Sequence, residues 1–89
     1  MRIVVTVVGQ DRVGIIAAVS AILAEHRVNI VNINQNIVEG FFNMVLIGDM
    51  ARARVPLKDL QQLLERTGRE LNLQIKVQHE DIFSTMHRI

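Results

Sequence analysis

The 89-residue sequence contains no cysteine, no tryptophan and no tyrosine, and it has three phenylalanines and one proline. Without cysteine, the chain has no disulfide framework, no thiol nucleophile and no thiolate metal site. Lysine and arginine number 10 against 9 for aspartate and glutamate, and they are scattered along the chain. This balance argues against a nucleic-acid binder, which gathers positive charge on one face.

Long apolar runs are also missing, so no segment approaches the length of a membrane span. The N-terminus leads straight into an apolar pattern, without the charged start and cleavage site of a secretory signal. We therefore expect a soluble cytoplasmic protein with no membrane partner. At 89 residues, 49% of them hydrophobic, the chain suffices for one small domain with a core and is too short for two.

The beginning of the chain predicts a strand, a tight turn and a helix. Residues 2–8 are β-branched and apolar, which favours a strand that Gly9 ends. Asp11 is placed to cap the helix, since its carboxylate can accept a free backbone N–H. Gly14 then falls in the first helical turn, where its predicted use is steric, to let backbone or ligand approach. The N-terminus of a helix also favours binding of a carboxylate ligand. A purely structural turn is nevertheless the commoner explanation of a strand–turn–helix segment with Gly and Asp in the turn.

Apolar residues then recur every three or four positions, which predicts a helix whose last turn and exit contain His26 and Arg27. A second strand is expected over residues 28–38 and a third over 41–49, joined by a two-residue turn at Glu39 and Gly40. That turn pairs Val38 with Phe41, Asn36 with Asn43, and Asn34 with Val45.

The two faces of this hairpin differ. The predicted core face carries aliphatic and aromatic side chains: Val31, Ile33, Ile37, Phe42, Met44 and Leu46. The other face mixes amides with apolar groups: Asn32, Asn34, Asn36, Asn43, Phe41, Val45 and Ile47. A solvated sheet face is one interpretation of the second set, and a subunit contact or polar pocket is the other.

The remainder predicts a second helix, a fourth strand and a helical tail. A leucine stripe follows Pro56, and Gly68 is a candidate for the end of this helix. Residues 72–78 alternate as a strand, with Leu73, Ile75 and Val77 inward. Apolar residues at helical spacing in the tail predict a short docking helix: Ile82, Phe83, Met86 and Ile89. Metal-ligand residue types gather there but lack the spacing of a zinc site, so no metal is expected: His79, Glu80, Asp81 and His87.

The predicted element order is strand–helix–strand–strand–helix–strand. With right-handed crossovers this order gives an α+β, ferredoxin-like βαββαβ sandwich, a four-stranded antiparallel sheet of order 4-1-3-2 with both helices on one face. A short C-terminal tail helix is added. We expect residues 1–79 to form the domain and residues 80–89 to form a tail that packs on it or on a second subunit.

One segment resembles the ACT domain family of small-molecule-sensing modules. The pattern is a hydrophobic strand, then Asp11, Arg12, any residue, Gly14 and an aliphatic helix, followed by Asn29-Ile30 at the start of the second strand. The length and tail look like the small standalone ACT proteins of bacteria and archaea. Two positions depart from the pattern: Asp11, where several amino-acid-binding members carry Asn, and the His26-Arg27 helix exit.

The resemblance implies a non-catalytic sensor without a cofactor, acting as a homodimer. It would bind a small molecule between subunits, expected to be an amino acid because members of this family bind amino acids. It would then signal to a separate partner such as a metabolic enzyme or regulator. The implied ligand-binding residues lie in the first loop of one chain and at the second strand of its neighbour: Gln10, Asp11, Arg12, Val13, Gly14 and Ile15, with Asn29.

Other function classes fit the residues less well. An acylphosphatase-type enzyme needs a phosphate-cradling loop that Asp11 would oppose, and no nucleophile can be placed beside a base. An RNA-recognition module needs aromatic residues on its middle strands, where this chain has only Phe41 and Phe42 at the hairpin. A structural dimerisation module without a ligand is the remaining alternative.

Overall fold

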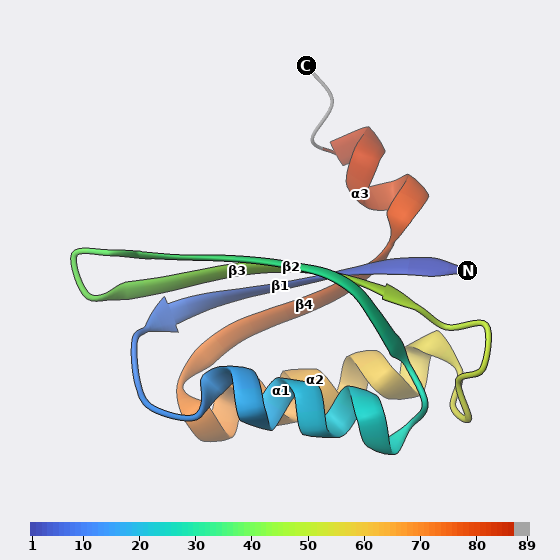
Figure 1. The fold of residues 1–89 in the computed structure, drawn as a ribbon, viewed down its shortest axis with the longest axis horizontal. Coiled ribbons are helices and arrows are strands. Elements are labelled where there is room, and N and C mark those ends of the chain that lie inside the picture. The colour runs from blue at the N-terminus through green and yellow to red at the C-terminus, as the bar shows by residue number, and fades with distance from the viewer. Residues whose placement is uncertain (87–89) are drawn as a thin grey trace.

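The computed structural model describes residues 1–86 and shows one antiparallel sheet with two helices below it and a third above (Figure 1). The elements are β1 (Arg2–Gln10), α1 (Ile15–Glu25), β2 (Asn29–Val38), β3 (Phe41–Asp49), α2 (Leu57–Leu71), β4 (Leu73–His79) and α3 (Glu80–Met86). The strand order is β2-β3-β1-β4, which is the predicted 4-1-3-2 order read from the other edge. The predicted fold class is therefore confirmed.

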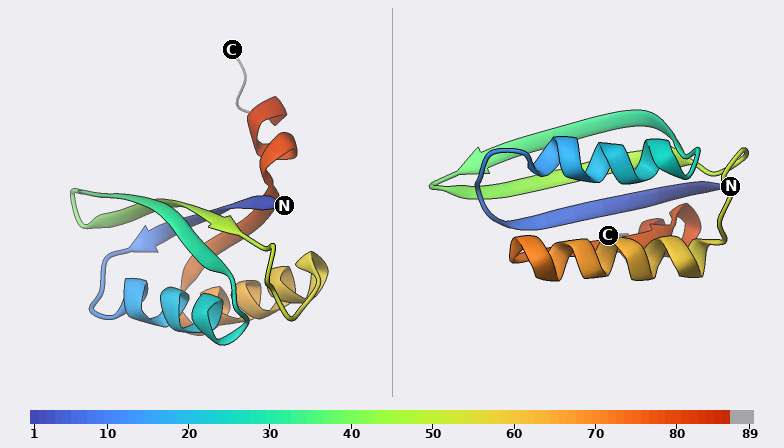
Figure 2. Two further views of the ribbon diagram at one scale, coloured as in Figure 1. Left: turned by 45° about the vertical axis from the view of Figure 1, so that its right-hand side comes forward. Right: turned by 90° about the horizontal axis from the view of Figure 1, so that it is seen from below.

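The core lies between the sheet and the pair α1 and α2, which cover the same face (Figure 2). Alternate residues of the central strand β1 point into it, and Ile3, Val5 and Val7 are fully buried. The helices contribute residues at three- and four-residue spacing from the faces turned to the sheet: Ile15, Val19, Leu23, Leu60 and Leu64. The amphipathic pattern read from the sequence thus orients both helices correctly.

Two glycines have different roles from those predicted. Gly9 does not end the first strand, because β1 continues to Gln10. A Cβ on Gly9 would lie 2.5 Å from Leu73 Cδ2, so this glycine permits close packing of β1 on β4. Gly68 does not end α2 either; a Cβ there would lie 2.7 Å from the Leu73 carbonyl oxygen. At both positions the helix or strand continues through a glycine whose missing side chain makes room for Leu73.

The β2–β3 hairpin has the predicted turn and register. Glu39 and Gly40 both have positive φ, 49° and 82°, as a two-residue hairpin turn requires. Val38 pairs with Phe41, Asn36 with Asn43 and Asn34 with Val45, and an irregularity between Ile30 and Asn32 interrupts the ladder. The hairpin extends beyond the helices at the left of Figure 1.

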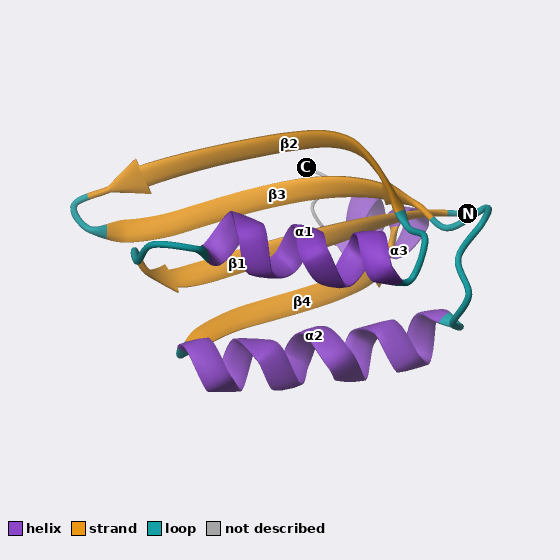
Figure 3. Ribbon diagram, turned by 60° about the horizontal axis from the view of Figure 1, so that its bottom comes forward, coloured by secondary structure: helices purple, strands orange, loops and turns teal. Residues whose placement is uncertain are grey.

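The predicted core face of this hairpin is only half correct. Phe42, Met44 and Leu46 of β3 are buried, but Ile33 and Ile37 of β2 are 36% and 55% exposed. The sequence pattern aims these β2 residues correctly, beside their β3 partners, yet α1 runs below β3 and β1 and leaves most of β2 uncovered (Figure 3). Residues 31–38 are all exposed in this chain.

The turn out of α1 explains the unusual His26-Arg27 exit. Arg27 adopts the left-handed conformation, with φ 59°, in the place where helices commonly have glycine. The Arg27 N–H donates to the Ala24 carbonyl at 3.1 Å, and the Val28 N–H donates to the Leu23 carbonyl at 2.8 Å. These two bonds form a Schellman motif that satisfies the last carbonyls of the helix without a glycine.

The tail begins with α3, which lies on the sheet face opposite α1 and α2 and contacts β1 and β4 (Figure 1). An ion pair joins Arg2 Nε to Glu80 Oε2 at 3.2 Å. Val4 points to this outer face and is nevertheless buried. His87 and Ile89 lie outside the described residues, and the division into a domain of residues 1–79 and a tail of residues 80–89 stays a prediction.

Candidate functional site

The first loop connects β1 to α1 and contains most of the predicted ligand-binding residues. The helix begins at Ile15, and its N-cap is Gly14, whose φ of 92° is left-handed. The Asp11 side chain is not the predicted cap; instead its backbone N–H donates to the Gly40 carbonyl at 2.8 Å and ties the loop to the hairpin turn. The carbonyl of Gly14 accepts the first helical bond, from the Ala18 N–H at 2.9 Å.

The structure does not show the close approach of protein backbone predicted at Gly14, and the predicted approach of a ligand stays a prediction. A Cβ at this position would meet no atom within 4 Å, and Gly14 precedes the helix instead of lying in its first turn. Glycine is favoured here because a left-handed residue with a side chain costs about 1–2 kcal/mol. A substitution at Gly14 therefore strains the backbone whether or not a ligand binds nearby.

The loop is open to solvent on several sides. Gln10, Asp11 and Arg12 are exposed, and Val13 is 99% exposed. The Ile15 side chain, in contrast, belongs to the core. With Gly14 as N-cap, the first N–H groups of α1 have no intrahelical carbonyl to bind, so they are free to donate hydrogen bonds to a carboxylate.

A cleft of about 340 Å³ lies beside this loop. Its lining joins the loop and the first turn of α1 to β2 and β3: Asp11, Arg12, Gly14, Ile15, Ile16, Ala17, Gln35, Ile37 and Phe42. The predicted site omitted Gln35 and Ile37, although one signal pointed to them. Gln35 is a polar side chain between Ile33 and Ile37 on the predicted inward face of β2, where a buried strand face would carry an aliphatic residue.

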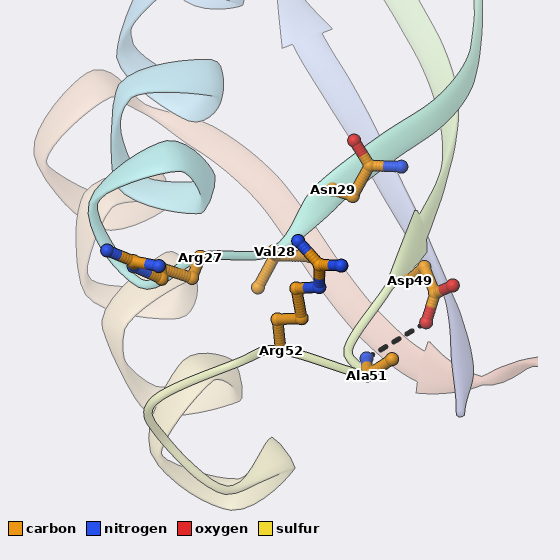
Figure 4. Close-up of a pocket in the computed structure, with 6 residues that line it drawn as sticks. All are labelled: Arg27, Val28, Asn29, Asp49, Ala51 and Arg52. Atoms are coloured by element: carbon orange, nitrogen blue, oxygen red, sulfur yellow. Dashed lines mark hydrogen bonds between the residues drawn. The ribbon is translucent and has the colours of Figure 1, made fainter.

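Asn29 lies at the opposite end of the sheet from the first loop. It pairs with Asp49, which pairs with Arg2 at the start of β1, whereas the loop follows Gln10 at the end of β1. The chain by itself therefore does not bring Asn29 to the other predicted residues. Asn29 instead lines a separate cleft of about 520 Å³ with Arg27, Val28, Asp49, Ala51 and Arg52 (Figure 4).

A model of the ACT domain matches residues 1–78. The chain belongs to the ACT domain family. This assignment confirms the resemblance drawn from the loop and from Asn29-Ile30, and it indicates a domain of a regulatory, typically ligand-binding type.

Small relatives of this ACT domain occur in archaea and bacteria. This chain is 49% identical over 88 residues to the UPF0237 protein of Methanocaldococcus jannaschii, and the alignment covers 99% of this chain and 98% of the relative. It is 46% identical over 89 residues to a UPF0237 protein of Clostridium perfringens, covering 100% of both. Among solved structures, an ACT domain protein from Streptococcus pneumoniae superposes with a TM-score of 0.81 at 34% identity, covering 93% of each chain.

Two further observations concern the ACT domain as described. Within residues 1–86, no helix has the length and apolar character needed to cross a membrane. In the same part of the chain, no three side chains of histidine, aspartate or glutamate are grouped so that they could hold a metal ion. Near the tail, His79 Nδ1 instead accepts the backbone N–H of Asp81 at 3.1 Å.

Proposed function

We propose that this ACT domain is a non-catalytic sensor that binds a small molecule, an amino acid or a close relative, between two copies of the chain. The occupied and empty dimers would differ in their affinity for a separate partner protein, such as a metabolic enzyme or regulator. The observation that carries the proposal is the uncovered edge strand β2, with the open first loop beside its C-terminal end.

The first step is dimerisation through β2. This strand has one paired edge, against β3, so its other edge presents backbone N–H and C=O groups without strand partners. Antiparallel pairing with β2 of a second copy would satisfy these groups and extend the sheet across a two-fold axis. β4, the other edge, is shorter, with seven residues against ten, and offers less backbone to pair.

The second step follows from the direction of the strands. Gln10 pairs with Phe41, and Phe41 pairs with Val38, so the first loop lies at the C-terminal end of β2. Antiparallel pairing places the N-terminal end of the partner's β2 at that same end. The partner's Asn29 would then approach the first loop, and the two halves of the predicted site, far apart within one chain, would meet between subunits.

The third step is recognition. The free N–H groups at the start of α1 can take a ligand carboxylate, and the Asp11 carboxylate can take an ammonium group. Asn29 of the second copy can donate or accept at either end. Gln35 and Ile37, which line the cleft beside the loop, are placed to contact the remainder of the ligand.

The test combines oligomeric state with ligand-dependent stability. We expect light scattering at micromolar concentration to give the mass of a dimer. In a thermal-shift screen of amino acids and related metabolites, a ligand at 100 times its Kd should stabilise the protein by about 2.7 kcal/mol. Asn29→Ala should weaken that ligand by about 1 kcal/mol through one lost hydrogen bond.

Asn34→Lys is a probe of the interface with a matched control. Asn34 lies in the middle of β2, where the two-fold axis would bring the two introduced lysines close together. Repulsion between them should shift the protein toward the monomer. Gln74→Lys, an exposed residue of β4, should leave the mass unchanged. A monomeric wild type would contradict the proposed assembly. A stable dimer that responds to no compound would favour a structural dimerisation module instead.

A further inference from the structure

A second cleft lies at the N-terminal end of β2, at the opposite end of the sheet from the first loop. One wall is the exit of α1 with Asn29, and the other is the end of β3 with the loop that follows (Figure 4). Its volume of about 520 Å³ falls in the range of small-molecule sites. The buried Val28 forms an apolar part of the lining, and polar side chains stand around it.

The walls are fixed by backbone bonds. Asn29 and Asp49 are paired in the β2–β3 ladder. The Arg54 N–H donates to the His26 carbonyl at 3.0 Å, which ties the loop after β3 to the exit of α1. Asp49 Oδ1 accepts the Ala51 N–H at 2.9 Å, so the carboxylate is held in place with its second oxygen still available. The backbone walls of the cleft and the Asp49 carboxylate are thus held in place before any ligand enters.

The cleft carries charges of both signs. Figure 4 shows the Arg52 guanidinium directed toward Asn29, with Asp49 on the other side of the cleft and the Arg27 side chain pointing away. No ion pair within 4.0 Å joins Arg52 to Asp49 in the part of the chain that the structure describes. A guanidinium binds carboxylates through parallel N–H donors, and a carboxylate binds an ammonium group. The two side chains together match a ligand that bears both charges.

We propose that this cleft binds the charged ends of a free α-amino acid. Arg52 donates to the ligand carboxylate, the second oxygen of Asp49 accepts from the ligand ammonium, and the Asn29 amide bonds to either group. A simple anion such as phosphate would meet repulsion from Asp49, and a simple amine would meet repulsion from Arg52. The ligand class rests on the proposed function; the inference adds a second site, in which Arg52 and Asp49 bind the two charges that the α1 N–H groups and Asp11 bind in the first.

The test is an NMR titration of the ¹⁵N-labelled full chain with each of the twenty standard L-amino acids in turn. The amino acid that binds is then compared with its decarboxylated amine and with its α-hydroxy acid, each of which lacks one charge. We expect backbone shifts at residues 49–52 and at Asn29, and at least tenfold weaker binding of both analogues.

Three variants sharpen the assignment. Asp49→Asn removes one charge with little change of shape and keeps an acceptor for the Ala51 N–H, and Arg52→Gln removes the other charge together with the guanidinium donors; each should weaken binding of the amino acid at least tenfold. Asp49→Asn should also remove the preference for the amino acid over the α-hydroxy acid. Arg54→Gln, an exposed cation of the same loop outside the cleft lining, is the control and should bind as the wild type does.

The outcomes separate this inference from the proposed function. Shifts confined to residues 10–15, with wild-type affinity in both charge variants, would overturn the inference and leave the sensor proposal standing. Shifts at residues 49–52 that Arg52→Gln abolishes, with no response in residues 10–15, would support the inference and overturn the shared site between subunits. Failure of all twenty amino acids to shift any residue would overturn the inference, whereas the sensor proposal would fall only if the screen of related metabolites were also negative.

Discussion

The two edge strands of the sheet have the same inward alternation of aliphatic residues but different neighbours. On β4, Leu73, Ile75 and Val77 are buried beneath α2. On β2, Ile33 and Ile37 hold equivalent inward positions and remain exposed. The alternation of a strand indicates which way its side chains point, and the placement of a helix decides whether they are covered. An aliphatic face that its own chain leaves open is the expected appearance of a surface completed by a second molecule.

The largest expected difference between the edges is in core packing. Ile75→Ala on β4 should cost about 2–5 kcal/mol of unfolding free energy, because it leaves a cavity beneath α2. Ile37→Ala on β2 should cost less than about 1 kcal/mol in a monomer, since the side chain is 55% exposed. Urea denaturation followed by circular dichroism measures both. A cost at Ile37 that rises with protein concentration would show that a second copy covers β2.

The contrast extends to the outer face of the sheet. There α3 contacts β1 and β4, so β4 has a helix on each face, whereas most of β2 has none. Deleting residues 80–89 removes the Arg2–Glu80 ion pair and uncovers Val4, which is 2% exposed on that face. We expect a loss of about 1–3 kcal/mol, mostly from Val4, because exposed ion pairs contribute little.

A point substitution separates docking of the tail on its own domain from docking on a second copy. Ile82 is 55% exposed, so Ile82→Ser should hardly change the stability of a single chain. If the truncated protein melts as the full chain does, the tail contributes nothing to the domain. If Ile82→Ser alone weakens the dimer, the tail contacts the second subunit.

Most of the fold could be predicted because its determinants are local. The turn at Glu39-Gly40 sets the register of the hairpin, and the apolar spacing of each helix sets the face that it buries. The roles of Gly9 and Gly68 could not be predicted, because both depend on Leu73, which is distant in sequence from Gly9 and packs against both glycines. A glycine that ends an element and one that admits a neighbour look the same in a sequence.

The candidate site was less predictable for the same reason. The first loop and Asn29 could be singled out from a motif, but their positions at opposite ends of the sheet follow from strand pairing over the whole domain. Arg52 and Asp49 gave no signal of their own, since charged residues at strand ends and in loops are usually solvated. Only the fold shows that they share a cleft with Asn29.

The smallest expected effect concerns how the chain enters each edge strand. A left-handed residue follows each helix: Asn72, with φ 59°, leads into β4, and Arg27, also with φ 59°, leads into β2. Asparagine tolerates this conformation because its short side chain can bond locally, and arginine does not. Arg27→Asn should therefore stabilise the protein by about 0.5–1 kcal/mol, and the reciprocal Asn72→Arg should destabilise it by a similar amount.

Thermal unfolding of the two variants beside the wild type measures this exchange, with Arg27→Gly as a further comparison. Arg27 lines the cleft, but its side chain points away from Asn29, Asp49 and Arg52, so the affinity of the Arg27→Asn protein for an amino acid shows whether this side chain takes part in binding. If Arg27→Asn raises the stability but weakens binding of the amino acid, the strained Arg27 is part of the binding site. Equal melting temperatures of all four proteins would show that the backbone bonds at the helix exits, and not the residue type, determine the entry into both edge strands.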